Sequence, residues 1–208
     1  MPFSSTIRTD GRPSGVAVAS AIRSASTSPE AAAASGIVEA ERMALATATP
    51  DGRPSVRIVL LKGIDEGGIR FFTNYESRKG RELDANPRAA ATLYWQPLAR
   101  AARLEVPVER LSTAESDAYF ASRPRGAQVG AWASEQGAVL EDRAELEERV
   151  RGVEERFPDE VPRPDYWGGY RLRPDAVELW QGRPDRLHDR EHFLLQPDGT
   201  WRTERLSP

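Results

Sequence analysis

The sequence predicts a mainly β fold with flanking helices, of the α+β class, built on an antiparallel sheet or barrel. Short apolar runs punctuated by turn-forming residues begin near Glu39, which is typical of strands joined by tight connections. These runs gather in two blocks, with helical patterns between them instead of after each strand. Regular alternation would predict a doubly wound parallel sheet, so the clustering favours antiparallel pairing.

Residues 1–36 precede this pattern and differ from it in composition. They are rich in Ser, Ala, Gly and Thr and show no sustained periodicity, so we expect a flexible N-terminal tail. The apolar stretch 16–22 has no strongly basic segment before it, which argues against a targeting signal and leaves a cytoplasmic location as the expectation. Residues 37–208 are expected to form one domain.

The first block should contain five strands and the second block four. The Pro-Asp-Gly turns at 50–52 and 197–199 join the first pair and the last pair as hairpins, because Pro, Asp and Gly suit tight turns. The expected strands of the first block are 43–49, 55–62, 69–74, 89–96 and 103–110. Those of the second block are 169–172, 176–181, 187–196 and 201–206.

Three helices are expected outside these strands. Residues 112–115 (Ser-Thr-Ala-Glu) have the spacing of a capping box, which opens a helix that reaches about Ser122. Residues 140–157 place apolar side chains at helical spacing beneath a charged face, which predicts a packing helix with a solvated outer side. The third helix covers 77–85 and ends before a proline.

Composition limits the function. The chain has 208 residues, no cysteine and two histidines, which excludes disulfides, thiolate metal sites and cysteine nucleophiles and argues against a metal centre. The net charge of −3 and the pI of about 5.6 give no overall attraction to nucleic acid or to an anionic membrane. No apolar run approaches the ~18 residues of a membrane span, so we expect a soluble protein that holds any anion by local groups.

Cationic side chains occupy positions where an anion would stabilise them. With Ser77 as N-cap, Arg78 and Lys79 lie in the first helical turn, where cations oppose the helix dipole. A bound phosphate would compensate, and a solvated surface pair is the alternative. Tyr119 and Arg123 are four residues apart near the end of the next helix, so they share a face and either clamp a phosphate or form a surface pair.

Two strands add further candidates. In strand 55–62 the alternation of side chains places Lys62 at the end of an apolar face, where it either reaches solvent or projects into a cleft. Read as a strand, residues 186–190 put Arg186, His188 and Arg190 on one face, either facing solvent or lying under an anionic ligand. These patterns alone do not name a reaction.

Short motifs along about four-fifths of the chain occur in a characteristic order. They are RIVLLK (57–62), FTN (72–74), SRK (77–79), SRPR (122–125), QVGAW (128–132), WGG (167–169) and WQG with RLHDR (180–182 and 186–190). Each motif is short, but the ordered set closely resembles the pyridoxine/pyridoxamine 5′-phosphate oxidase family. The resemblance implies an FMN-binding split β-barrel of antiparallel Greek-key type. It also implies a homodimer, with dimerisation strands near the C-terminus and FMN at the subunit interface.

The resemblance also implies an activity and a set of site residues. Family members oxidise pyridoxamine or pyridoxine 5′-phosphate to pyridoxal 5′-phosphate, with FMN as cofactor, O2 as acceptor and H2O2 as product, in vitamin B6 metabolism. By position, the FMN contacts would be Arg57, Ile58, Val59, Leu60, Leu61, Lys62, Phe72, Thr73, Arg78, Lys79, Gln136, Trp180 and Arg190. The substrate contacts would be Lys62, Tyr119, Arg123, Arg186 and His188, of which Arg186 and His188 would position and polarise the reacting ring edge.

The chain departs from the family pattern at three polar positions. Ala101, Ala127 and Gly137 stand where the family usually has a glutamine, a serine and a polar residue. These departures leave alternatives open. One is a related flavin oxidase acting on a secondary metabolite, as in phenazine pathways. Others are a flavin or pyridoxal phosphate binder without turnover, and a barrel that binds no flavin.

Overall fold

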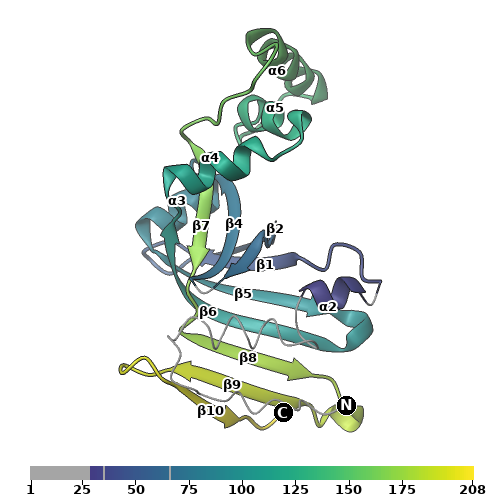
Figure 1. Cartoon of the computed structure of the whole chain (residues 1–208), viewed down its shortest axis with the longest axis vertical. Coiled ribbons are helices and arrows are strands. Elements are labelled where there is room, and N and C mark those ends of the chain that lie inside the picture. Colours follow the sequence, from purple (N-terminus) through teal and green to yellow (C-terminus); the bar gives the residue numbers. More distant parts are fainter. Residues whose placement is uncertain (1–28, 35, 66) are drawn as a thin grey trace.

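The computed structural model describes residues 29–34, 36–65 and 67–208, and Figure 1 shows how their elements are arranged. The strands are β1 (Arg42–Ala48), β2 (Pro54–Leu60), β3 (Gly63–Asp65), β4 (Gly68–Asn74), β5 (Arg88–Trp95), β6 (Arg100–Arg110), β7 (Trp167–Leu172), β8 (Ala176–Gln181), β9 (Asp189–Leu195) and β10 (Trp201–Arg205). The helices are α2 (Pro29–Ala34), α3 (Arg78–Ala85), α4 (Thr113–Ala121), α5 (Arg125–Ala133), α6 (Arg143–Arg156) and the short 3-10 turns η1 (Gln96–Leu98) and η2 (Pro184–Arg186).

The strands form one curled antiparallel sheet, which confirms the predicted α+β class. The main order of strands is β10-β9-β8-β6-β5-β1-β2. Strand β7 pairs with β6 and with β4, and β4 also pairs with β3. Strand β6 makes the bend, because Arg100–Glu105 pair with β8 whereas Val108–Arg110 pair with β7. Helices α4, α5 and α6 extend beyond the end of β4 and β7, as Figure 1 shows.

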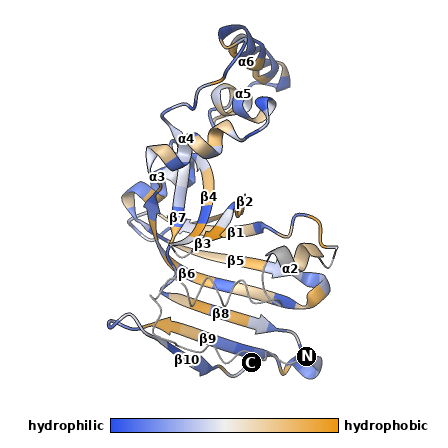
Figure 2. Cartoon of the chain, in the orientation of Figure 1, coloured by the Kyte–Doolittle hydropathy of each residue, from blue (hydrophilic) through white to orange (hydrophobic). Residues whose placement is uncertain are grey.

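Two apolar clusters stabilise this arrangement. The larger cluster lies within the sheet and contains fully buried Met43, Leu45, Phe71 and Leu93. The smaller one joins α4, α5 and α6 to the start of β7, around Trp167. In Figure 2, β1, β5 and β8 are largely hydrophobic, whereas β10 and part of β9 are hydrophilic. Helix α6 is strongly hydrophilic, in agreement with its predicted solvated face. Within the described ranges, no helix combines the length and apolarity needed to cross a membrane.

Most predicted elements are present, and the differences have local causes. Helix α5 was not predicted, because its sequence contains two glycines and its N-cap, Pro124, has no side chain that can cap it. Strand β3 was missed because it has only three residues. Helix α2 lies inside the stretch assigned to the tail, and its Ala32 is completely buried in the larger cluster. The remainder of the predicted tail, residues 1–28, lies outside the described residues.

Candidate active site

A cavity of about 730 Å³ lies between β2, β4, β7 and the helices α3, α4 and α5. This volume is within the usual range for small-molecule and cofactor sites. Its lining contains most of the predicted site residues from these elements: Arg57, Ile58, Val59, Leu60, Lys62, Phe72, Thr73, Lys79, Tyr119, Arg123 and Gln136. Ser122, Pro124, Ala127 and Trp167 complete it. The fold therefore brings residues that are up to 110 positions apart into one cavity.

Lys79 is a buried cation in the wall of this cavity. Its Nζ donates to Thr73 Oγ1 at 2.9 Å, Ser77 Oγ at 3.1 Å and Gln136 Oε1 at 2.7 Å. All three acceptors are neutral, and no carboxylate in the described ranges forms an ion pair with Nζ. Burial, together with repulsion from Arg57, lowers the pKa of Lys79 to about 8. The alternative of a solvated surface pair is therefore wrong for Lys79, whose buried charge has no carboxylate partner among the described residues.

The start of α3 fixes the position of Lys79. Ser77 is the N-cap as predicted, and its hydroxyl accepts from the Gly80 N–H at 3.3 Å. Gly80 is required there, since a Cβ on it would lie 1.9 Å from the backbone oxygen of Tyr75. This tight first turn directs Lys79 back toward Thr73 on β4.

Arg57 and Arg78 differ from Lys79 because they share a carboxylate. Glu82 is 4% exposed; it accepts from Arg78 Nε at 2.8 Å and lies 3.3 Å from Arg57 Nη2. Thr47 and Ser55 each donate to the same Glu82 oxygen at 2.5 Å. Burial raises the pKa of Glu82, but the hydrogen bonds from Ser55, Thr47 and Arg78 outweigh burial and lower it to about 2.

Sequence reasoning missed Glu82, although its spacing of four residues from Arg78 is a helical ion-pair signal. Arg57 lines the cavity, whereas Arg78 does not and has a largely exposed side chain. Leu61 also stays out of the lining, since its side chain is buried in the larger apolar cluster. Lys62 lines the cavity and is exposed, which is consistent with its predicted position at a strand end.

A second cation, Arg123, lies at the α4 side of the cavity. Its guanidinium carbon is 4.5 Å from the Trp167 ring centroid, and its Nη1 is buried without a hydrogen-bond partner. Burial lowers the pKa of Arg123. Beside it the rings of Phe72 and Tyr119 stack at 3.8 Å between centroids, and burial raises the pKa of the Tyr119 phenol, which is therefore neutral at pH 7.

The remaining predicted site residues lie elsewhere in the chain. Arg186 belongs to η2 and has φ of 61°, and β9 begins only at Asp189. The predicted row of Arg186, His188 and Arg190 on one strand face is therefore wrong, because the chain turns before the strand starts. His188 packs on Trp180 with 4.7 Å between ring centroids, and its Nδ1 accepts from the Arg183 N–H at 3.1 Å.

Arg190 is neutralised within its own strand pair. Its Nε and Nη2 donate to the two oxygens of Glu178, each at 2.9 Å, and Arg103 Nη1 lies 3.2 Å from the same carboxylate. Hydrogen bonds from Arg190 lower the pKa of Glu178 despite its burial. Arg190 thus has a structural partner in this chain.

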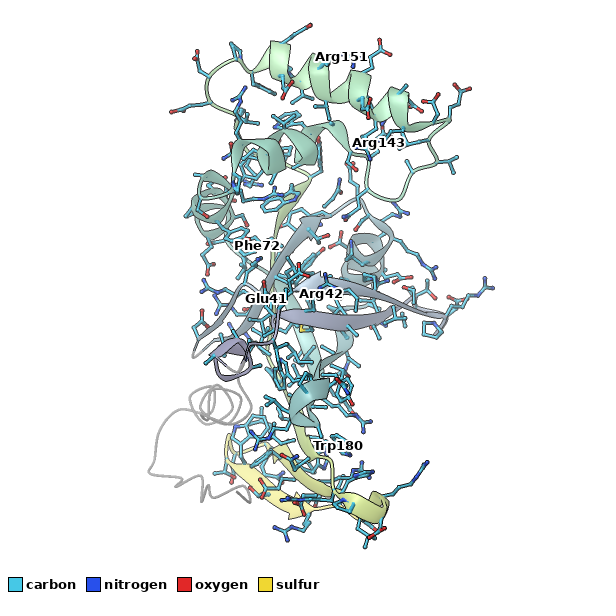
Figure 3. All side chains as sticks on the ribbon, turned by 90° about the vertical axis from the view of Figure 1, so that its right-hand side faces the viewer. Glu41, Arg42, Phe72, Arg143, Arg151 and Trp180 are labelled. Carbon is cyan, nitrogen blue, oxygen red and sulfur yellow. The ribbon has the colours of Figure 1, made fainter. Side chains whose placement is uncertain are left out.

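The sheet separates these two groups of residues. Strands β8 and β2 are four positions apart in the order, which corresponds to about 19 Å along the sheet at roughly 4.8 Å per strand. Figure 3 shows Phe72 and Trp180 at different levels of the long axis. One chain alone therefore does not bring Arg186 and His188 to the cavity.

The fold and the cavity define a class of protein: a curled antiparallel half-barrel whose cavity is lined by the buried Lys79 and the half-buried Arg123. Residues 29–157 match the family described as "Pyridoxamine 5'-phosphate oxidase", and residues 167–208 match "Pyridoxine 5'-phosphate oxidase C-terminal dimerisation region". The chain belongs to the pyridoxamine 5′-phosphate oxidase family.

Similar proteins agree with this membership. The pyridoxine/pyridoxamine 5'-phosphate oxidase of Burkholderia lata is 56% identical over 179 residues, covering 85% of this chain and 84% of that protein. Its counterpart from Rubrobacter xylanophilus is 56% identical over 180 residues, covering 86% and 82%.

Two solved structures share the fold. PhzG from Burkholderia lata, in complex with tetrahydrophenazine-1-carboxylic acid, has a TM-score of 0.81 and 33% identity and covers 86% of this chain and 88% of its own. A pyridoxamine 5'-phosphate oxidase-related, FMN binding protein from Nostoc punctiforme has a TM-score of 0.69 and 19% identity, with coverage of 84% and 91%. These structures confirm the predicted split β-barrel fold.

Proposed function

We propose that this protein is an FMN-dependent oxidase that converts pyridoxamine or pyridoxine 5′-phosphate to pyridoxal 5′-phosphate, with O2 as acceptor and H2O2 as product. The observation that carries the proposal is a pair of cations in one cavity, the buried Lys79 and the half-buried Arg123, neither of which forms an ion pair with a carboxylate of the described residues. A reaction between a phosphorylated cofactor and a phosphorylated substrate needs two such anion sites. The 56% identity to pyridoxine/pyridoxamine 5′-phosphate oxidases names the phosphorylated substrate, and FMN is the cofactor of these oxidases.

Lys79 and its neighbours suit the cofactor phosphate. The three N–H donors of Lys79 now contact neutral oxygens of Thr73, Ser77 and Gln136, which would remain as hydrogen-bonding neighbours of a dianion. Arg57 adds a guanidinium whose charge is partly balanced by Glu82. When bound, FMN supplies the two-electron oxidation and passes the electrons to O2.

Arg123, Tyr119 and Lys62 suit the substrate phosphate. Arg123 offers unoccupied N–H donors, which a phosphate ester accepts in a bidentate manner, and Tyr119 offers a neutral hydroxyl. Lys62 adds a solvent-accessible ammonium at the rim. Phe72 gives the same side of the cavity a flat apolar surface that limits where a ring can lie.

We further propose that the working unit is a homodimer. Residues 167–208 match a region described as a dimerisation region, and they carry Trp180, Arg186, His188 and Arg190. Because one chain keeps these residues away from its own cavity, we infer that a second copy supplies them. Strand β2 supports this inference, since as an edge strand it exposes Val56 and Ile58 at 69% and 61%.

A flavin oxidase of the phenazine type is the second candidate, supported by the likeness to PhzG. The comparison with two proteins of Burkholderia lata favours the pyridoxine/pyridoxamine 5′-phosphate oxidase activity over the phenazine-type activity. The chain is 56% identical to the Burkholderia lata pyridoxine/pyridoxamine 5′-phosphate oxidase but 33% identical to PhzG of Burkholderia lata, over nearly equal shares of the chain.

Two measurements test the proposal. The purified protein should show the visible absorption bands of a flavin, and the FMN-loaded protein should release H2O2 with pyridoxamine 5′-phosphate. Turnover of neither pyridoxamine nor pyridoxine phosphate by FMN-loaded protein would contradict the proposed activity. Retention of ligand without peroxide would favour a binding protein, and colourless protein that ignores added FMN would favour a barrel without flavin.

We also propose a cytoplasmic location, because the family is typically cytoplasmic. Cell fractionation tests it: the protein should be recovered with cytoplasmic markers, and recovery in another fraction would contradict the proposal.

A further inference from the structure

The Arg123 side chain is held by aromatic rings instead of a carboxylate. Its guanidinium carbon lies 4.5 Å from the centroid of Trp167 and 5.5 Å from that of Phe120. No ion pair joins it to a carboxylate in the described part of the chain, and Nη1 has no hydrogen-bond partner. The aromatic faces attract the cation without using its N–H donors.

Other arginines near the predicted site are held differently. Arg57 shares Glu82 with Arg78, and Arg190 binds Glu178 through two hydrogen bonds. A carboxylate that neutralised Arg123 in this way would occupy its donors and cancel part of its attraction for a phosphate. The aromatic support therefore keeps both the charge and the donors of Arg123 available to a ligand.

Trp167 can give this support because its own ring is fixed. It is 6% exposed, lies nearly parallel to Phe72 at 5.7 Å and to Tyr119 at 6.2 Å, and meets Phe120 edge-on at 5.1 Å. Its backbone is held as well, since it opens β7 opposite Asn74. The indole is thus a rigid platform beneath the guanidinium.

We propose that Trp167 is a positioning residue for Arg123 and sets the preference of the site for phosphorylated over unphosphorylated substrate. This inference rests on the proposed function, in which Arg123 binds the substrate phosphate. It assigns to Trp167 an effect on the phosphate contact rather than on the oxidation step.

Kinetics of a Trp167→Leu variant, loaded with FMN, test the inference. A cation–π contact corresponds to about a 2- to 30-fold change in affinity. The KM for pyridoxamine 5′-phosphate should rise by about this factor, while kcat stays within about twofold. The ratio of kcat/KM for pyridoxine 5′-phosphate to that for pyridoxine should fall by the same factor, which loss of packing alone does not cause. Trp167→Phe keeps a π face and should show a smaller change in both quantities.

A double-mutant cycle with Arg123→Met separates positioning from a direct substrate contact. In the Arg123→Met protein, Trp167→Leu should change the KM by less than about twofold, because the interaction it supports is already gone. Phe157→Leu is the matched control, since Phe157 packs on the same apolar cluster without contacting Arg123, and it should leave the substrate ratio unchanged. If Trp167→Leu does not fold, the same cycle is run with Trp167→Phe.

The outcomes separate this inference from the proposed function. The inference is overturned if Trp167→Leu raises the KM by the same factor with and without Arg123, or if the ratio of kcat/KM for pyridoxine 5′-phosphate to that for pyridoxine stays unchanged. The proposed function is upheld in either case if the wild type is active. A wild type without turnover overturns the function. The inference is then judged by calorimetric binding of pyridoxal 5′-phosphate against pyridoxal, in the same set of variants. Failure of the wild type to prefer pyridoxal 5′-phosphate overturns the inference as well.

Discussion

Replacing Lys79 by methionine should stabilise the FMN-free protein and weaken FMN binding. In the folded protein the pKa of Lys79 is lowered from 10.5 to about 8, so at pH 7 the folded state carries a penalty of about 3 kcal/mol for keeping this buried group charged. Methionine removes the penalty but also three hydrogen bonds to neutral acceptors, each contributing roughly 1 kcal/mol. At that value the two contributions cancel, and at the lower end of about 0.5 kcal/mol per hydrogen bond the FMN-free protein gains about 1.5 kcal/mol in its free energy of unfolding.

The pH dependence of stability tests this lowered pKa of Lys79 directly. Between pH 8 and 10.5 the unfolded chain binds more protons than the folded one, so the wild-type free energy of unfolding rises with pH in this window. The advantage of Lys79→Met is fully present below pH 8 and disappears as pH approaches 10.5. Urea denaturation at pH 7 and pH 9.5, at one protein concentration, measures both values.

FMN affinity should move in the opposite direction. Loss of a charge-assisted contact to phosphate corresponds to roughly 1.5 to 3 kcal/mol, or about a 10- to 150-fold higher Kd in a flavin fluorescence titration. Lys62→Met is the matched control, because Lys62 lines the same cavity but is exposed, and its stability should change by less than about 0.5 kcal/mol. A less stable FMN-free Lys79→Met protein with unchanged FMN affinity would refute the reasoning and make Lys79 a structural hydrogen-bonding residue.

Three further changes probe other parts of the site. Glu82→Ala leaves buried partners without their carboxylate and should lower the free energy of unfolding by about 3 to 5 kcal/mol. Glu147→Ala removes an exposed ion pair of the same helical spacing and should cost about 0.5 kcal/mol or less. Similar losses for the two variants in urea denaturation would contradict the structural role of Glu82. Ala127→Ser adds a hydroxyl to the cavity wall and should lower the KM for pyridoxamine 5′-phosphate about 2- to 10-fold, so an unchanged KM argues against a phosphate there. Arg186→Ala and Arg123→Met subunits, each with low activity alone at a substrate concentration far below their raised KM, should regain about a quarter of wild-type activity when mixed, because half of the dimers carry one intact shared site. No recovery despite subunit exchange contradicts the shared site.

The sequence predicted the elements that have strong local signals. The capping box at Ser112 and the N-cap at Ser77 are present as expected, because each motif depends on contacts within four residues. Helix α5 has no comparable signal, since its cap has no side-chain hydrogen bond and its glycines lower helix propensity. Local chemistry therefore explains both the correct and the missed elements.

The predicted site was harder to complete from sequence, because charge pairing depends on strand register. Nothing local shows that Glu82 accepts from Ser55, 27 residues away, or lies against Arg57, 25 residues away. The turn at Arg186 was also hidden, because alternation suggested a strand that in fact begins three residues later. Residue types and order indicated the ligand chemistry, but not which cations are already neutralised.

That distinction explains how the cavity can bind dianions in a chain with a net charge of −3. Arg57, Arg78 and Arg190 have carboxylate partners, which balance part of the charge of each and use it to stabilise the fold. Lys79 is buried and Arg123 is half-buried, and neither has such a partner among the described residues. Folding has therefore already removed part of the water from both cations, so a ligand phosphate does not have to displace it. The uncompensated cations at both ends of the cavity thus lower the stability of the FMN-free protein and raise its affinity for phosphates. For this reason the free energy of unfolding and the FMN affinity should change in opposite directions when Lys79 is replaced.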